Sequence, residues 1–137
     1  MTSLHPQPLT FAVRNGSAVV IGCRAHVTEV TIPAEYNGLP VTSIAPAAFR
    51  SHPHLLSVTL PDSLRTVGDD AFADCHTLMS VSAGSGLERL GERAFLRCIS
   101  LTKLDFRTVP DADITTFAGC YQLQASGEVA SYRRTEA

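Results

Sequence analysis

The sequence predicts a β-rich α/β solenoid, in which short strands and short helical turns wind around one apolar core. Four phenylalanines recur at intervals of 23, 23 and 22 residues, at positions Phe49, Phe72, Phe95 and Phe117. Apolar residues recur at fixed distances around each of them, and residues 58–60 (Val-Thr-Leu) alternate apolar and polar side chains as a strand does. Self-similarity at a fixed period of this length indicates stacked structural repeats.

The first element that we expect is a β-hairpin over residues 10–26, after a loose leader at residues 1–9. Two apolar runs, residues 11–13 and 18–21, flank the pair Asn15-Gly16. An Asn-Gly pair supplies the positive φ angles that a tight hairpin turn needs. The first repeat of an array otherwise exposes its core face, so this hairpin is predicted to act as a cap.

About four repeats are expected over residues 27–125, followed by a polar tail at 126–137. Each repeat is predicted to hold a short strand, a turn, a second short apolar segment such as residues 64–67, and one turn of helix at the phenylalanine. The apolar columns eight and five residues before the phenylalanines are Val41, Leu64, Leu87 and Val109, and Ile44, Val67, Leu90 and Ala112. The first repeat is longer by five residues, and the fourth is weaker. A period of this length is typical of leucine-rich repeats.

The composition limits the possible functions. The chain has 137 residues, of which 45% are hydrophobic and 18% charged, which predicts one folded domain with a real core. The net charge of −2 and the scattered Lys and Arg residues give no signature of nucleic-acid binding. No apolar run approaches the ~18–20 residues of a membrane span, and no secretion signal is recognisable, so a cytoplasmic protein is expected.

One column combines residue types that can bind zinc. It stands three residues after each phenylalanine and consists of His52, Cys75, Cys98 and Cys120. Neighbouring coils of a solenoid lie ~4.8 Å apart, so these four side chains would form a line ~14 Å long. Zinc needs all four ligands within ~2.0–2.3 Å of one point. We therefore expect buried packing residues, with no metal and no cofactor.

Four further chemical interpretations are weaker than the structural ones. Parallel side chains oppose a disulfide between neighbouring cysteines, and an apolar column opposes a nucleophile made from Cys75 with His54 or His76. The acidic residues 69, 70 and 74 lack the spacing of a calcium loop and are expected to cap helical turns. Residues 84–86 (Gly-Ser-Gly) precede no helix long enough to hold a phosphate. No catalytic residue is expected, and the protein is predicted not to be an enzyme.

The polar side of the strand ladder is the expected partner-binding face, because solenoids bind partners on such extended surfaces. Its two outward columns are Glu29, Ser57, Ser80 and Lys103, and Thr31, Thr59, Ser82 and Asp105. Neither column carries an aromatic anchor. The insertion around Tyr36-Asn37-Gly38 breaks the repeat and is expected to expose Tyr36, so it is a second candidate contact site.

Several repeats closely resemble one known family. Residues 57–78 contain Val-Thr-Leu-Pro-Asp-Ser-Leu and Asp-Asp-Ala-Phe-Ala-Asp-Cys, and residues 87–101 contain Leu-Gly-Glu-Arg-Ala-Phe-Leu-Arg-Cys. These segments resemble the BspA-like leucine-rich repeat family, and the resemblance covers residues 10–124. It implies a right-handed leucine-rich-repeat superhelix. It also implies a role in protein interaction or adhesion, often at a bacterial surface.

The sequence therefore predicts a non-catalytic leucine-rich-repeat protein that binds an unknown protein partner through the polar face of its strand ladder. The alternative is a structural or accessory unit that self-associates, or that acts within a larger assembly or a surface adhesin system. The weak fourth repeat favours this alternative, because it would leave an open sheet edge. We expect a monomer or weak self-association through the terminal repeat.

Overall fold

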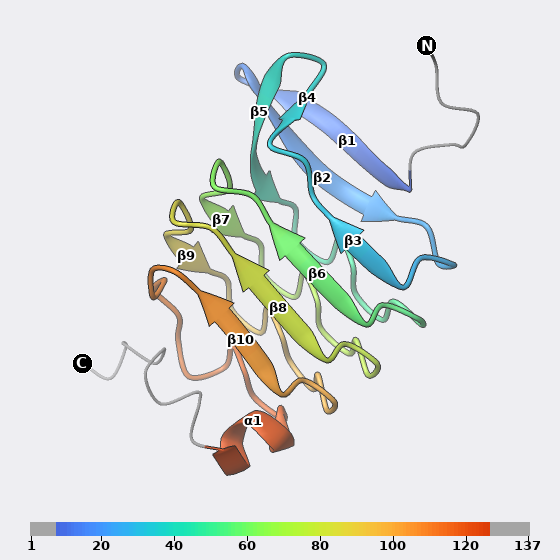
Figure 1. The fold of residues 1–137 in the computed structure, drawn as a ribbon, viewed down its shortest axis with the longest axis vertical. Coiled ribbons are helices and arrows are strands. Elements are labelled where there is room, and N and C mark those ends of the chain that lie inside the picture. Colours follow the sequence, from blue (N-terminus) through green and yellow to red (C-terminus); the bar gives the residue numbers. More distant parts are fainter. Residues whose placement is uncertain (1–7, 127–137) are drawn as a thin grey trace.

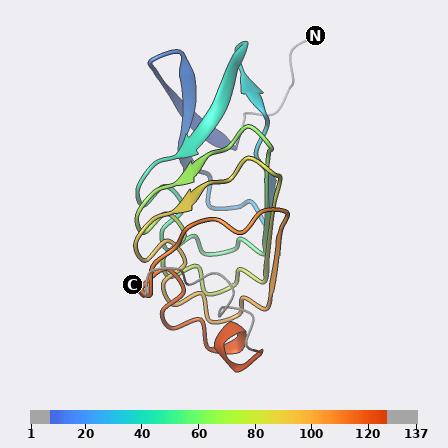
Figure 2. The same cartoon turned by 90° about the vertical axis from the view of Figure 1, so that its left-hand side faces the viewer.

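The protein is a solenoid with one ladder of short strands on each of two sides, and the strands of successive coils pair in parallel. The computed structural model describes residues 8–126. One ladder is a four-stranded sheet made of β3 (Glu29–Thr31), β6 (Ser57–Leu60), β8 (Ser80–Ala83) and β10 (Lys103–Phe106). The other is a six-stranded sheet made of β1 (Leu9–Arg14), β2 (Ser17–Cys23), β4 (Glu35–Tyr36), β5 (Leu39–Ile44), β7 (Thr66–Val67) and β9 (Arg89–Leu90). Figures 1 and 2 show the chain passing between the two sheets in successive coils. The predicted solenoid is confirmed.

The register of the strands follows the period of the sequence. Ser57 pairs with Ser80, and Ser80 pairs with Lys103, each 23 residues further along the chain. Glu29 pairs with Ser57 across the five-residue insertion. Val58 and Leu60 point into the core, whereas Thr59 between them is exposed. Because side chains alternate along a strand, this register gives each coil an apolar inner face and a polar outer face.

The N-terminal hairpin forms as predicted. β1 pairs antiparallel with β2, and the turn residues Asn15 and Gly16 have φ angles of 53° and 80°. The hairpin also extends the six-stranded sheet, because β2 runs parallel to β5 and places Ala18 and Val20 beside core residues of the first coil. Both side chains are fully buried. The hairpin therefore covers the end of the core with its side chains and extends the sheet through backbone hydrogen bonds.

The insertion in the first repeat forms a second hairpin, which sequence reasoning missed. β4 and β5 pair antiparallel around Asn37 and Gly38, whose φ angles are 51° and 82°. Tyr36 is not the exposed aromatic that was expected. Its ring is half-buried and stacks on Phe11, with ring centroids 4.2 Å apart and an interplanar angle of 17°. The reason is that the second hairpin lays Tyr36 against the first.

The expected single turns of helix take the form of consecutive tight turns. We number the coils by their phenylalanines, from Phe49 in the first to Phe117 in the fourth. In the second coil, the N–H groups of Ala71, Ala73 and Cys75 each donate to the carbonyl three residues earlier. Asp70 and Asp74 have φ angles of 59° and 61°, and a helix cannot continue through such residues. Within residues 8–126 the one helix is α1 (Tyr121–Ser126).

The four phenylalanines form the centre of the core. Each is at most 2% exposed, and neighbouring rings stack with centroids 4.7, 5.1 and 5.5 Å apart and interplanar angles of 12°, 4° and 7°. The backbone repeats the same contact, because Phe72 N–H donates to Ala94 O at 2.7 Å and Phe95 N–H donates to Thr116 O at 2.8 Å. One coil is thus placed on the next by rings and backbone together.

The fourth coil differs from the sequence prediction at one position. Val109 was expected in the buried column of Val41 and Leu64, but it is 41% exposed. Pro110 is buried instead. Residues up to Pro110 keep the 23-residue spacing, whereas the bridge between Arg89 and Asp111 spans 22 residues. The fourth repeat is one residue shorter than the third, and this deletion lies directly after Pro110. The sequence prediction had placed it before Val109.

Truncating one ring of the stack should be costly. Phe72→Ala or Phe95→Ala is expected to lower the free energy of unfolding by about 3–5 kcal/mol, because the cavity would lie between two retained rings. Chemical denaturation measures the change. The control Met79→Ala removes a side chain that is 51% exposed, and it should cost less than about 1 kcal/mol. A loss that small for Phe72→Ala would contradict the assignment of the ring stack as the core.

Candidate protein-interaction face

The eight residues predicted to form the outward columns lie together on the outer side of the four-stranded sheet. The strand register aligns Glu29, Ser57, Ser80 and Lys103 in one column and Thr31, Thr59, Ser82 and Asp105 in the next. Their side chains are exposed or half-exposed. We call this set the strand face. Tyr36 is not part of it.

The strand face has hydroxyl groups at its centre and charged groups at its two ends. Ser82 Oγ donates a long hydrogen bond of 3.5 Å to Thr59 Oγ1. Glu29 stands on the first strand, whereas Lys103 and Asp105 stand on the last. Exposed hydroxyls can both donate and accept hydrogen bonds, so the centre can adapt to a partner's polar groups.

A groove of about 390 Å³ runs along the C-terminal ends of β6, β8 and β10 and extends the strand face. It is lined by Thr59, Ser82 and Asp105 of the face together with Asp62 and Arg107. Sequence reasoning missed these last two residues. Their signal was their place in the repeat, because each follows an outward column residue by two or three positions.

The glycines beside this groove are required by packing. A Cβ atom on Gly84 would overlap Asp62 Oδ1, and one on Gly86 would overlap the Asp62 carbonyl. The Asp62 carboxylate accepts a hydrogen bond of 2.9 Å from Ser85 N–H. The Gly-Ser-Gly stretch is therefore the place where the second coil's turn rests on the third.

Two exposed apolar side chains lie next to the strand face and were also missed. Leu56 and Met79 directly precede β6 and β8 and are 40% and 51% exposed. They occupy neighbouring coils, since Met79 N–H donates to Leu56 O at 2.7 Å. Apolar residues beside a polar rim are common in protein interfaces. Their spacing of 23 residues, just before each strand, was the available signal.

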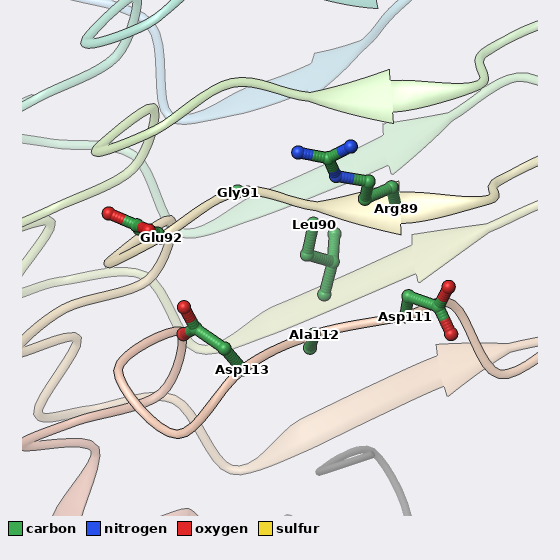
Figure 3. Close-up of a pocket in the computed structure, with 7 residues that line it drawn as sticks. All are labelled: Arg89, Leu90, Gly91, Glu92, Asp111, Ala112 and Asp113. Carbon is green, nitrogen blue, oxygen red and sulfur yellow. The ribbon is translucent and has the colours of Figure 1, made fainter. Parts of the chain in front are cut away.

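A second hollow, of about 420 Å³, lies over β9 and the adjacent segment of the fourth coil (Figure 3). Its charged residues do not converge, because Arg89, Glu92 and Asp111 point in different directions in Figure 3. Asp113 accepts hydrogen bonds of 2.8 and 2.6 Å from Thr115 N–H and Oγ1. Burial opposes ionisation of Asp113, but these bonds hold its pKa below the ordinary value.

The column of histidine and cysteines is buried and hydrogen-bonded to backbone. Each cysteine Sγ donates to a phenylalanine carbonyl of the preceding coil, Cys75 to Phe49 and Cys98 to Phe72 at 3.1 Å, and Cys120 to Phe95 at 2.9 Å. His52 Nε2 bonds Arg24 O at 2.7 Å. Burial raises the pKa of Cys75 to about 11, and the Cys120 thiol and burial raise the pKa of Cys98.

All four cysteines are free thiols. In the part of the chain that the structure describes, no group of three His, Cys, Asp or Glu side chains could hold a metal ion. The predicted packing role of the three buried cysteines agrees with their burial, and their hydrogen bonds add a second role. Each thiol is a second donor to a carbonyl that already accepts a backbone N–H of its own coil.

The acidic cluster of the second coil connects it to the third. The Asp70 carboxylate accepts hydrogen bonds from Arg93 Nε and Nη2 at 3.0 and 3.1 Å. The Asp74 carboxylate accepts a hydrogen bond from Arg97 Nε at 2.8 Å, and this bond lowers the pKa of Asp74. Asp69 Oδ1 accepts from Glu92 N–H at 2.8 Å. These three aspartates were expected to cap helical turns. They instead form hydrogen bonds with the next coil.

Comparisons with known proteins agree with this architecture. A family model described as BspA type leucine-rich repeat region matches residues 23–126 in six copies. No curated protein matches the chain significantly. A leucine-rich repeat protein of Bacteroides capillosus has 30% sequence identity and a TM-score of 0.76, and the match covers 88% of this chain and 93% of that one.

Two more distant structures share the fold. A leucine-rich cell surface protein of Faecalibacterium prausnitzii has 23% identity and a TM-score of 0.75; the match covers 90% of this chain but only 35% of that one, so this chain spans about a third of its length. A leucine-rich repeat protein of T. pallidum has 17% identity and a TM-score of 0.55, with 93% and 94% of the chains covered. Within residues 8–126, no helix is long and apolar enough to cross a membrane.

Thiol reactivity should separate structural from reactive cysteines. At pH 8 a chromogenic aromatic disulfide should react with Cys23 well before the other cysteines, because Cys23 is half-buried whereas the other three thiols are fully buried. Burial raises the pKa of Cys23 as well as that of Cys75, so the difference in rate rests on access to the thiol. All four should react once the protein is unfolded. A Cys23→Ala control should remove the fast phase. Rapid labelling of native Cys75, located by mass spectrometry, would contradict the structural role.

A substitution beside the groove should show that the glycines there are structural. Gly84→Ala is expected to lower the free energy of unfolding by about 1–3 kcal/mol, because its Cβ overlaps Asp62. Gly22→Ala is the control, since a Cβ there meets nothing within 4 Å. Adding Asp62→Ala to Gly84→Ala should recover part of the loss. Equal stability of the Gly84 and Gly22 variants would show that no such packing constraint exists.

Proposed function

Because the chain belongs to the BspA-type leucine-rich repeat family, we propose that it is a non-catalytic module that binds a protein partner through the strand face. The observation that carries this proposal is the alignment of eight outward polar residues by the strand register. They form a continuous surface on the rigid element of the fold, and rigid elements present binding groups with little entropic cost.

The chemistry of the face supports a protein partner. Its central hydroxyls suit a partner's backbone and side-chain polar groups, and the exposed Leu56 and Met79 beside it offer apolar contact. Charges of both signs lie at the β10 end, in Lys103, Asp105 and Arg107. This mixture does not favour the polyanionic backbone of a nucleic acid, which needs a basic surface.

A non-catalytic role is supported by where the reactive groups are. Cys75, Cys98 and Cys120 lie in the core, and Asp70 and Asp74 are engaged by arginines of the third coil. General acid–base or nucleophilic chemistry needs such groups within hydrogen-bond reach of one another in an accessible hollow. In the hollow over β9, the side chains of Arg89, Glu92 and Asp111 point in different directions.

The free thiols support a reducing compartment, and we propose the cytoplasm as the site of action. The Faecalibacterium relative is described as a cell surface protein. A surface location is therefore the alternative setting for the same binding activity.

The second candidate function is self-association as an accessory unit. The observation that favours it is the edge of the four-stranded sheet at β10, where the described residues supply a neighbouring strand on one side only.

A pair of matched double variants tests the strand face. Partners captured by cross-linking in extracts of the source organism would be identified by mass spectrometry, and their affinities measured by calorimetry with purified proteins. Ser57→Arg with Ser80→Arg should weaken binding about tenfold or more, because two bulky charges then cover the central column. Both variants should first show an unchanged circular dichroism spectrum.

The control is Ser43→Arg with Thr66→Arg, which changes an equivalent neighbouring pair on the six-stranded sheet. It should leave the affinity unchanged. The proposal fails if the control weakens binding as much as the face variant, or if the face variant binds normally.

A further inference from the structure

Among the described residues, the last strand of the four-stranded sheet has a neighbouring strand on one side only. β10 follows β8, β6 and β3 in the sheet order, and within residues 8–126 no further strand lies beyond it. Figure 1 shows β10 as the outermost strand of its sheet, with α1 near the start of the strand. An edge of this kind can pair with another strand.

The outward backbone groups of β10 can be identified from its inner hydrogen bonds. Lys103 N–H donates to Met79 O at 3.2 Å, and Arg107 N–H donates to Ala83 O at 3.5 Å. Successive residues of a strand direct their backbone groups to alternate sides, so Leu104 directs its N–H and C=O away from β8. The residue as a whole is 6% exposed, and its side chain belongs to the core. Leu104 thus offers a donor and an acceptor on the side of β10 that faces away from β8.

We propose that two copies of the chain pair through β10, antiparallel and around a twofold axis at Leu104. In this arrangement Leu104 exchanges two backbone hydrogen bonds with the partner's Leu104. Lys103 then lies directly opposite the partner's Asp105, and Asp105 lies opposite the partner's Lys103. The twofold axis generates the second charge pair from the first. One copy of β10 therefore carries both charges that the pairing needs.

Charge complementarity is what selects a second copy as the occupant of this edge. Lys103 and Asp105 flank Leu104, and both side chains are exposed. Opposite charges directly across an antiparallel pair stabilise it, and like charges destabilise it. The other edge of the sheet, β3, carries Glu29 and Thr31 at the equivalent positions and has no positive residue to complete such a pair.

The twofold pairing closes on itself and therefore gives a dimer, not a fibre. Its axis is perpendicular to the sheet, so the two four-stranded sheets would join into one, and both strand faces would lie on the same side. Two copies of the partner-binding surface would then act together, which raises the strength of binding to a repetitive or dimeric partner.

Charge reversal tests the pairing with the full chain. Analytical ultracentrifugation should show wild-type dimers whose population grows with concentration up to the millimolar range and falls at high salt. Lys103→Asp or Asp105→Lys alone should raise the dissociation constant roughly tenfold, because both attractive pairs become repulsive. The double variant Lys103→Asp with Asp105→Lys should recover the wild-type constant, because it restores opposite charges.

A disulfide trap tests the register independently. Around a hydrogen-bonded pair at Leu104, residues 103 and 105 of the two copies form a non-hydrogen-bonded pair with Cα atoms ~4.5 Å apart, which suits a disulfide. A mixture of the Lys103→Cys and Asp105→Cys proteins should give a covalent dimer under mild oxidation. A mixture of Glu29→Cys and Thr31→Cys, on the β3 edge, is the control and should not.

The proposal is overturned if the wild-type protein stays monomeric throughout the concentration range. It is also overturned if the dimer is insensitive to the single charge reversals, if the double variant does not recover, or if the β3 mixture cross-links as readily as the β10 mixture.

Discussion

Parallel backbone pairing between coils is the constraint on which the rest of the structure depends. It holds each residue beside its equivalent about 23 positions later, at the strand spacing of ~4.8 Å. Rings then lie on rings, with centroids 4.7 to 5.5 Å apart, and thiols reach the carbonyls of the coil before. Outside, the same spacing turns single polar residues into columns. The core and the strand face therefore both follow from one register, and a shift by one residue would exchange them.

The tight turns that this register needs place several non-glycine residues in the left-handed region. Asp70, Asp74, Arg93 and Arg97 have φ angles of 59°, 61°, 57° and 56°. Such conformations are unfavourable for L-residues with a Cβ atom. In the second and third coils the same residues form two arginine–carboxylate pairs between coils. The residues in the left-handed region are thus also residues that join one coil to the next. Each of these exposed ion pairs stabilises the fold by only about 0–1 kcal/mol.

Sequence reasoning could predict what repeats, but not what varies within a repeat. The columns of Phe72 and Val58 were predictable because each position is confirmed by its neighbours in other repeats, and the strand face followed from alternation. The exchange of Val109 for Pro110 was not predictable, since a missing residue can be placed on either side of a turn. The expected exposure of Tyr36 was wrong because Asn37-Gly38 was interpreted as an irregular insertion. The equivalent pair Asn15-Gly16 had correctly predicted the first hairpin. The binding role of the strand face stays a prediction.

The two hairpins at the start of the chain have a consequence for how the protein folds. Both are closed by an Asn-Gly turn between strands that are adjacent in sequence, so each forms by local contacts, and β2 and β5 then join them. Every later coil can add to this template by closing a loop of about 23 residues, at nearly constant entropic cost. Assembly from the N-terminal end is thus the expected direction, and it is the order in which a ribosome delivers the coils.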